Sequence, residues 1–166
     1  MSDYGESYSA SSTDRQTRGL WNPLRILIVD DDDDIRDFID WVLTAYGYRA
    51  DTAADSADAW KALRARSYDL LITDHNMPKV TGIELVRALR SDRMTLPVVL
   101  MSGTLPEEAL VQNSSLQIAG ILLKPFTMEE LVGTVTKVLH AAQFGASPAA
   151  SSPNDDRATS VPRVQI

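Results

Sequence analysis

Four short apolar runs in the sequence each end in polar residues that can bind a metal ion or a phosphoryl group. In an open parallel sheet the carboxyl ends of the strands line one crevice, and ligands bind there. Side chains at these four ends are therefore expected to converge. Three carboxylates, one hydroxyl and one ammonium can hold a hard cation and stabilise a phosphoryl group. The residues in question are Asp30 and Asp31, Asp74, Ser102 and Lys124.

The acidic pair Asp30 and Asp31 directly follows the first apolar run. Adjacent carboxylates repel each other unless a cation compensates them, and Mg²⁺ prefers oxygen ligands. The alternative is a solvated acidic loop that caps the next helix, a role that can account for residues 32–34; for the pair itself both interpretations stay open. A calcium-binding EF-hand is excluded, because Ile35 stands where the loop needs glycine and Trp41 where it needs glutamate.

The other three candidates also have an ordinary structural explanation. A carboxylate such as Asp74 beside a divalent cation can act as a nucleophile toward phosphorus, but a lone aspartate at a strand end also starts turns. The hydroxyl of Ser102, before Gly103, can donate to a phosphoryl oxygen or serve a turn. For Lys124 the alternative is an exposed lysine at a strand end, but this residue is more specific, because a lysine at the end of a buried strand is costly unless carboxylates pair with it. Pro125 makes the preceding bond a candidate for the cis form.

Alternating strand and helix patterns are expected to position these residues. Strands are predicted at residues 26–29, 48–53, 70–73, 98–101 and 118–123, each followed by an amphipathic helix. The sequence therefore predicts an α/β fold, a doubly wound five-stranded parallel sheet with five helices. Pro106 opens the fourth helix. The core-facing helical residues are predicted to be Ile35, Phe38, Ile39, Val42, Leu43, Ala59, Leu63, Ile83, Val86, Leu89, Leu131, Val135, Val138 and Leu139, with Leu85 near the edge and Trp41, Trp60 and Tyr46 as packing residues.

Composition limits the remaining possibilities. The chain has 166 residues, no cysteine and a formal net charge of −7, which excludes a thiolate metal site and argues against a nucleic-acid-binding surface. No apolar run approaches the roughly 18 residues of a membrane span, and residues 1–18 do not resemble a secretory signal. We therefore expect a cytoplasmic protein without a membrane partner. Residues 1–22 and 143–166 are predicted to be disordered, and residues 23–142 to form the folded domain.

The strings ILIVDD, LLITDHNMP, PVVLMSG and KPF occur in this order, with Gly82 four residues after Pro78. Together they resemble the receiver domain of bacterial response regulators, the chemotaxis-type (CheY-like) phosphoacceptor. The resemblance implies a flavodoxin-like three-layer sandwich. It also implies that the protein is not an enzyme in the usual sense, but catalyses its own phosphorylation and dephosphorylation.

The resemblance assigns a role to each candidate residue. Asp74 is implied to be the phosphorylation site and, with Asp31, to bind Mg²⁺ directly. Asp30 is implied to assist through water, and the backbone carbonyl of Asn76 to complete the protein ligands. The remaining two candidates, Ser102 and Lys124, are implied to bind phosphoryl oxygens.

The resemblance also implies partners. The phosphoryl group comes from a histidine of a kinase or a histidine phosphotransfer protein. The output is then a contact with a downstream protein on the fourth-helix, fifth-strand and fifth-helix face, or onward phosphotransfer. Ile121 occupies a position where the family often has tyrosine or phenylalanine as a rotating switch. Since no second apolar core follows the domain, we expect a stand-alone receiver.

Two other functions compete with this interpretation. A Mg²⁺-dependent phosphatase of the haloacid-dehalogenase type would use Asp30 as nucleophile and Asp32 as acid, but it leaves Asp74 unexplained. The other is a receiver-like scaffold that is never phosphorylated. A Mg²⁺-dependent modification at Asp74 separates all three.

Overall fold

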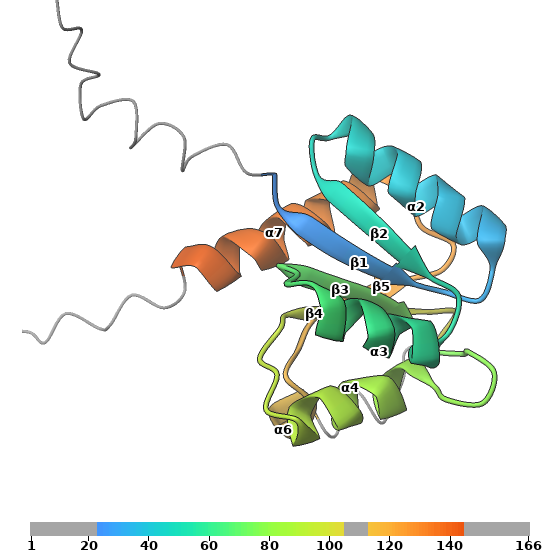
Figure 1. The fold of residues 1–166 in the computed structure, drawn as a ribbon. Helices are drawn as coiled ribbons and strands as arrows, with labels where there is room; N and C mark the ends of the chain where they lie inside the picture. Colours follow the sequence, from blue (N-terminus) through green and yellow to red (C-terminus); the bar gives the residue numbers. More distant parts are fainter. Residues whose placement is uncertain (1–22, 105–112, 145–166) are drawn as a thin grey trace, which may run out of the picture.

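The structure is a computed structural model that describes residues 23–104 and 113–144. Its centre is one parallel sheet of five strands in the order β2-β1-β3-β4-β5 (Figure 1). The predicted doubly wound fold is therefore confirmed. The strands are β1 (Arg25–Val29), β2 (Arg49–Ala53), β3 (Leu70–Asp74), β4 (Val98–Ser102) and β5 (Ile118–Leu123).

Helices cover both faces of this sheet. In Figure 1, α2 and α7 lie on one side of the strands and α3 and α4 on the other. The predicted fourth helix at Pro106 lies outside the described residues, as do residues 1–22 and 145–166. The final helix ends two residues beyond the predicted end of the domain. The described helices are α2 (Asp33–Ala45), α3 (Ser56–Ala65), α4 (Gly82–Ser91), the single turn α6 (Asn113–Leu116) and α7 (Met128–Phe144).

The strand order places the most apolar runs at the centre of the sheet. Every residue of β3 and β4 is buried, as expected for parallel strands covered on both faces. Alternate side chains enter two separate cores: Leu27, Leu71 and Leu100 pack with α3 and α4, whereas the residues between them pack with α2 and α7. The sheet is thus the wall between two hydrophobic layers.

Local capping fixes where the helices begin and end. The side chain of Asp32 accepts the backbone N–H groups of Asp34 and Ile35 and so caps α2. Gly47, with a φ of +88°, follows that helix in the left-handed conformation that favours glycine. Thr81 caps α4 in a reciprocal pair of hydrogen bonds with Glu84. The loops that carry the candidate site residues are therefore fixed on their helix side.

Some packing expectations were wrong. Leu85, predicted near the edge of the helix face, is fully buried. Trp41 and Tyr46 are 64% and 53% exposed, so neither is a core residue. Phe38 is also mostly out of the core, because its ring packs against Phe126 after β5 with a centroid distance of 6.4 Å. The remaining predicted core positions are buried or packed against the two cores.

Candidate functional site

Three of the predicted site residues meet at the carboxyl end of the sheet. The Lys124 Nζ lies 2.7 Å from Asp30 Oδ2 and 2.6 Å from Asp74 Oδ1. The two aspartates are only 1% and 5% exposed. One ammonium therefore bridges two buried carboxylates that are 44 positions apart in sequence.

Strand alternation explains this meeting. Asp30, Asp74 and Lys124 each lie two positions after a residue of the core under α2 and α7, namely Ile28, Ile72 and Leu122. The three side chains therefore extend the same face of the sheet beyond its last apolar layer. Ser102 lies two positions after Leu100, a residue of the core under α3 and α4, so strand alternation places it on the opposite face of the sheet.

The cluster holds two carboxylates and a single ammonium, so negative charge is in excess. Burial raises the pKa of Asp30 above its usual range, although hydrogen bonds from Lys124 and from the Asp32 backbone act against this shift. Burial by itself lowers the pKa of Lys124, but its hydrogen bonds to Asp30 and Asp74 outweigh burial and raise it. The lysine is thus held in its charged form, and one further positive charge would be needed to neutralise both carboxylates.

Backbone contacts hold each carboxylate in place. The backbone N–H of Asp32 donates to Asp30 Oδ1 at 3.0 Å, and that of Asn76 donates to Asp74 Oδ2 at 2.6 Å. Each aspartate therefore has one oxygen on Lys124 and the other on an amide of its own loop. The Lys124–Pro125 peptide bond is cis, as the sequence suggested.

The backbone at Asp74 and His75 lies directly against the start of α4. A Cβ atom at Gly82 would lie 2.2 Å from the Asp74 carbonyl oxygen, and the Gly82 N–H donates to the His75 carbonyl at 3.1 Å. Glycine is thus required where the first turn of α4 meets the end of β3.

Ser102, Asp31 and Asn76 are placed differently from the three clustered residues. Ser102 is fully buried, and its hydroxyl accepts the Thr104 N–H at 3.4 Å. The side chains of Asp31 and Asn76 are exposed beside the cluster. Within the described ranges, no three histidine, cysteine or acidic residues are grouped closely enough to form a metal site. The structure therefore brings together Asp30, Asp74 and Lys124, and not the full predicted ligand set.

The donors that are present nevertheless fit Mg²⁺. This ion commonly takes one or two carboxylates and keeps several waters, so a cage of protein ligands is unnecessary. Two buried carboxylates share a single ammonium here, and an oxygen-binding dication supplies the compensation that they lack. Asp31 and the Asn76 carbonyl stand on the two loops that carry these carboxylates.

Arg36 is a site residue that the sequence interpretation missed. Its guanidinium donates to the Asp30 carbonyl at 2.6 Å and also bonds the Asp33 carboxylate. The signal that could have revealed it is a single basic residue two positions after a run of five aspartates. Among the described residues, the Nδ1 atom of His75, next to Asp74, is buried without a hydrogen-bond partner.

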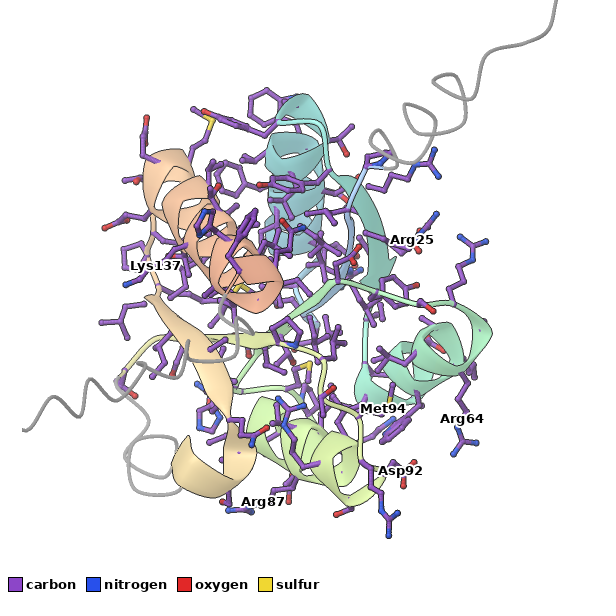
Figure 2. The ribbon with its side chains drawn as sticks, turned by 90° about the vertical axis from the view of Figure 1, so that its left-hand side faces the viewer. Arg25, Arg64, Arg87, Asp92, Met94 and Lys137 are labelled. Carbon is purple, nitrogen blue, oxygen red and sulfur yellow. The ribbon has the colours of Figure 1, made fainter. Side chains whose placement is uncertain are left out.

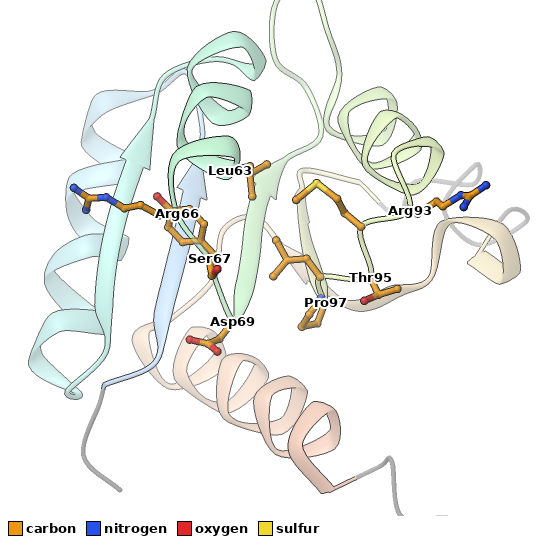
Figure 3. Close-up of a pocket in the computed structure, with 10 residues that line it drawn as sticks. Leu63, Arg66, Ser67, Asp69, Arg93, Thr95 and Pro97 are labelled. Carbon is orange, nitrogen blue, oxygen red and sulfur yellow. The ribbon is translucent and has the colours of Figure 1, made fainter. Parts of the chain in front are cut away.

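A separate pocket lies at the amino ends of the strands. The cavity has a volume of about 520 Å³ and lies between the α3–β3 and α4–β4 loops. Figure 3 shows Leu63, Asp69 and Pro97 in its wall. Because Asp69 and Pro97 precede β3 and β4, the cavity is at the opposite end of the sheet from Asp74. It is not part of the carboxylate site.

Comparison with known proteins identifies the family. A family model described as the response regulator receiver domain matches residues 26–136. The chain belongs to this family. Receiver domains are parts of two-component systems, typically bind Mg²⁺, interact with histidine kinases and downstream targets, and are not classical enzymes.

Individual relatives agree with this assignment. The receiver is 33% identical over 118 residues to the chemotaxis protein CheY of Pseudomonas aeruginosa, covering 69% of this chain and 95% of that protein. It is 29% identical to the alkaline phosphatase synthesis transcriptional regulatory protein PhoP of Bacillus subtilis, covering 80% of this chain but 55% of that protein. The crystallised chemotaxis protein CheY4 of Vibrio cholerae matches at 31% identity with a TM-score of 0.66, covering 70% of this chain and 98% of that one.

These relatives include both single receivers and longer regulators. The chain spans almost all of the Pseudomonas chemotaxis protein and about half of the transcriptional regulator. Among the described helices, none is long and apolar enough to cross a membrane.

Proposed function

We propose that this receiver is a phosphoacceptor in which Asp74 takes a phosphoryl group from a phosphohistidine donor in the presence of Mg²⁺. The observation that carries the proposal is the Lys124 ammonium bridging Asp30 and Asp74 at 2.7 and 2.6 Å. A buried carboxylate beside a fixed ammonium is a nucleophile placed next to the charge that stabilises its product.

Each residue of the site has a defined part in this reaction. An Asp74 carboxylate oxygen attacks phosphorus in line, the bond from phosphorus to the donor imidazole breaks, and the electron pair leaves with that imidazole. Lys124 stabilises the negative charge on the transferring oxygens and, with Ser102, binds them afterwards. Asp31 and Asp74 would hold the metal directly, Asp30 through water, and the Asn76 carbonyl would complete the ligands. The bound cation supplies charge neutralisation at the phosphoryl oxygens.

The proposed partners follow from the same chemistry. The donor is a histidine kinase or a histidine phosphotransfer protein. The phosphorylated receiver then contacts a downstream protein or passes the phosphoryl group on. We place the downstream contact on the fourth-helix, fifth-strand and fifth-helix face. In its described part, formed by β5 and α7, Leu123 is 44% exposed beside a groove of about 440 Å³. We place the protein in the cytoplasm.

Neither competing function receives support. The phosphatase alternative makes Asp30 the nucleophile and Asp32 the acid, but the Asp32 carboxylate caps α2. This alternative also leaves Asp74, which shares Lys124 with Asp30, without a role. A scaffold that is never phosphorylated does not require a lysine shared by two buried carboxylates. It remains an outcome of the experiment.

The test is intact-protein mass spectrometry after incubation with acetyl phosphate, with and without Mg²⁺. We expect a Mg²⁺-dependent phosphoryl adduct on the wild type and on Asp92→Asn, a control at an exposed aspartate, and no adduct on Asp74→Asn. An adduct that persists in Asp74→Asn would overturn the assignment. If the wild type shows neither an adduct nor binding of beryllofluoride, a mimic of the phosphoryl group, the chain is a scaffold.

A further inference from the structure

We propose that Arg36 is a positioning residue that fixes Asp30, and with it the acidic loop between β1 and α2, in the geometry that the site requires. The metal part of this inference rests on the proposed function. The positioning part can be tested without any metal.

The contacts of Arg36 carry the first step. The guanidinium bridges two acceptors on one loop, the backbone carbonyl of Asp30 at 2.6 Å and the carboxylate of Asp33. Its side chain is only 13% exposed. Burying a guanidinium is costly unless its donors are bonded. This residue is therefore committed to the loop rather than to solvent.

The position of Arg36 in its helix carries the second step. A positive charge near a helix N-terminus opposes the helix dipole, which favours negative residues there. Arg36 lies in the first turns of α2, which begins at Asp33. The helix dipole therefore does not favour an arginine at this position, whereas the bond to the Asp30 carbonyl accounts for its burial.

The consequence for Asp30 is the third step. Arg36 holds its carbonyl, Lys124 holds Oδ2 and the Asp32 N–H holds Oδ1. Both the backbone and the side chain of Asp30 are thus fixed. Because Arg36 also bonds Asp33, that carboxylate is held on the helix side of the loop. Asp30 thus faces the site, whereas Asp32 and Asp33 are bonded at the start of α2.

The planar fork of arginine is essential to this arrangement. It offers several donors in a fixed geometry, whereas a lysine ammonium is a single point charge. Arg36→Lys keeps the charge but cannot reproduce the bridge, and Arg36→Gln removes both. Arg64→Gln is the matched control, since this arginine projects from α3 over Trp60 at the surface (Figure 2).

The metal-free experiment measures hydrogen exchange of the Asp32 amide, which donates to Asp30 Oδ1. We expect faster exchange in Arg36→Lys and in Arg36→Gln than in the wild type, with no change in Arg64→Gln. Unchanged exchange in both Arg36 variants would overturn the proposal, whatever the wild type does with Mg²⁺. If Arg36→Gln does not fold, Arg36→Lys decides the result.

The second experiment measures Mg²⁺ affinity by calorimetry at constant ionic strength. Removing a nearby positive charge by itself tightens the binding of a dication, whereas loss of positioning weakens it. We expect Arg36→Gln and Arg36→Lys to bind Mg²⁺ about tenfold more weakly than the wild type. Equal or tighter binding by Arg36→Gln contradicts the proposal. A wild type that binds no Mg²⁺ contradicts the proposed function instead, and Asp32 exchange still decides the role of Arg36.

Discussion

Gly82 packs directly against the backbone of Asp74, and a Cβ atom on it would lie 2.2 Å from the Asp74 carbonyl oxygen. The partner in this clash is backbone at the end of a fully buried strand, which cannot move aside like the tip of a flexible side chain. Position 82 therefore controls where the carboxylate of Asp74 stands.

Gly82→Ala is expected to damage both stability and the site. The new methyl group forces β3 and α4 apart, and overpacking of this kind costs about 2–3 kcal/mol in the free energy of unfolding. Urea unfolding measures this cost, and the rate of adduct formation with acetyl phosphate should fall with it. Gly133→Ala is the control, because a Cβ there meets no atom within 4 Å. Alanine inside α7 should stabilise by up to about 1 kcal/mol, and equal effects of the two substitutions would contradict this account.

Lys124→Met is expected to destabilise the protein at neutral pH. The substitution leaves Asp30 and Asp74 buried without their ammonium, and breaking a buried pair in this way costs about 3 kcal/mol. Burial already raises the pKa of Asp30, so the penalty should shrink as acid protonates one carboxyl. Mg²⁺ should reduce it as well. Urea unfolding at several pH values measures the effect.

The control for Lys124→Met is Lys61→Met, which breaks an ion pair with Asp58 at 2.8 Å in which the side chains are 79% and 53% exposed. Exposed pairs contribute roughly 0–1 kcal/mol. Equal losses in the free energy of unfolding for the two substitutions would show that Lys124 does not compensate the buried charges of Asp30 and Asp74.

Ionisation of Tyr68 is expected to lower the stability of the protein at alkaline pH. Burial, together with the hydrogen bond that its hydroxyl donates to Asp51 at 2.8 Å, raises its pKa from 10.0 to about 12. The folded state thus keeps a proton that the unfolded state releases first. The contribution of Tyr68 is complete below pH 10 and is lost as the pH rises through about 12. Urea midpoints across this range should fall more steeply for the wild type than for Tyr68→Phe. Parallel curves would contradict this assignment.

Arg90 is expected to hold the end of α4 against the start of β5. Its guanidinium donates to the carbonyls of Met94, Leu116 and Gln117 at 2.7, 2.8 and 3.2 Å. Burial lowers its pKa, which is consistent with a partly desolvated cation. Arg90→Met leaves these carbonyls without their donor and should cost about 1–3 kcal/mol in urea unfolding. Arg49→Met, at an exposed arginine of the edge strand β2, should change stability by less than about 0.5 kcal/mol.

The fold could be predicted from the sequence because parallel strands that are buried on both faces are continuous apolar runs. Leu70 to Thr73 and Val98 to Met101 are such runs, and both lie at the centre of the sheet. Helix surfaces were less predictable. Trp41 has the helical spacing of a core residue but is 64% exposed, since hydrophobic spacing does not say how wide the covered stripe is.

The site residues whose positions follow from the strands could be predicted, whereas those whose positions depend on loop conformation could not. Asp30, Asp74 and Lys124 follow the alternation of their strands, so their meeting could be expected from strand ends alone. The direction of Asp31 depends on the loop, and its side chain is exposed. The role of Arg36 depends on how α2 is oriented relative to the loop that contains Asp30. The hydrophobic periodicity of the sequence does not specify this orientation.

Lys124 and Asp30 are joined by a hydrogen bond across 94 positions of sequence. The two residues end the last and the first strands along the chain, and the chain must close this long loop before they meet. Contacts of such separation form slowly during folding. A nascent or truncated chain that lacks β5 would keep Asp74 but not the ammonium beside it. Under the proposed function, the complete site for accepting a phosphoryl group would thus form only when the last strand docks.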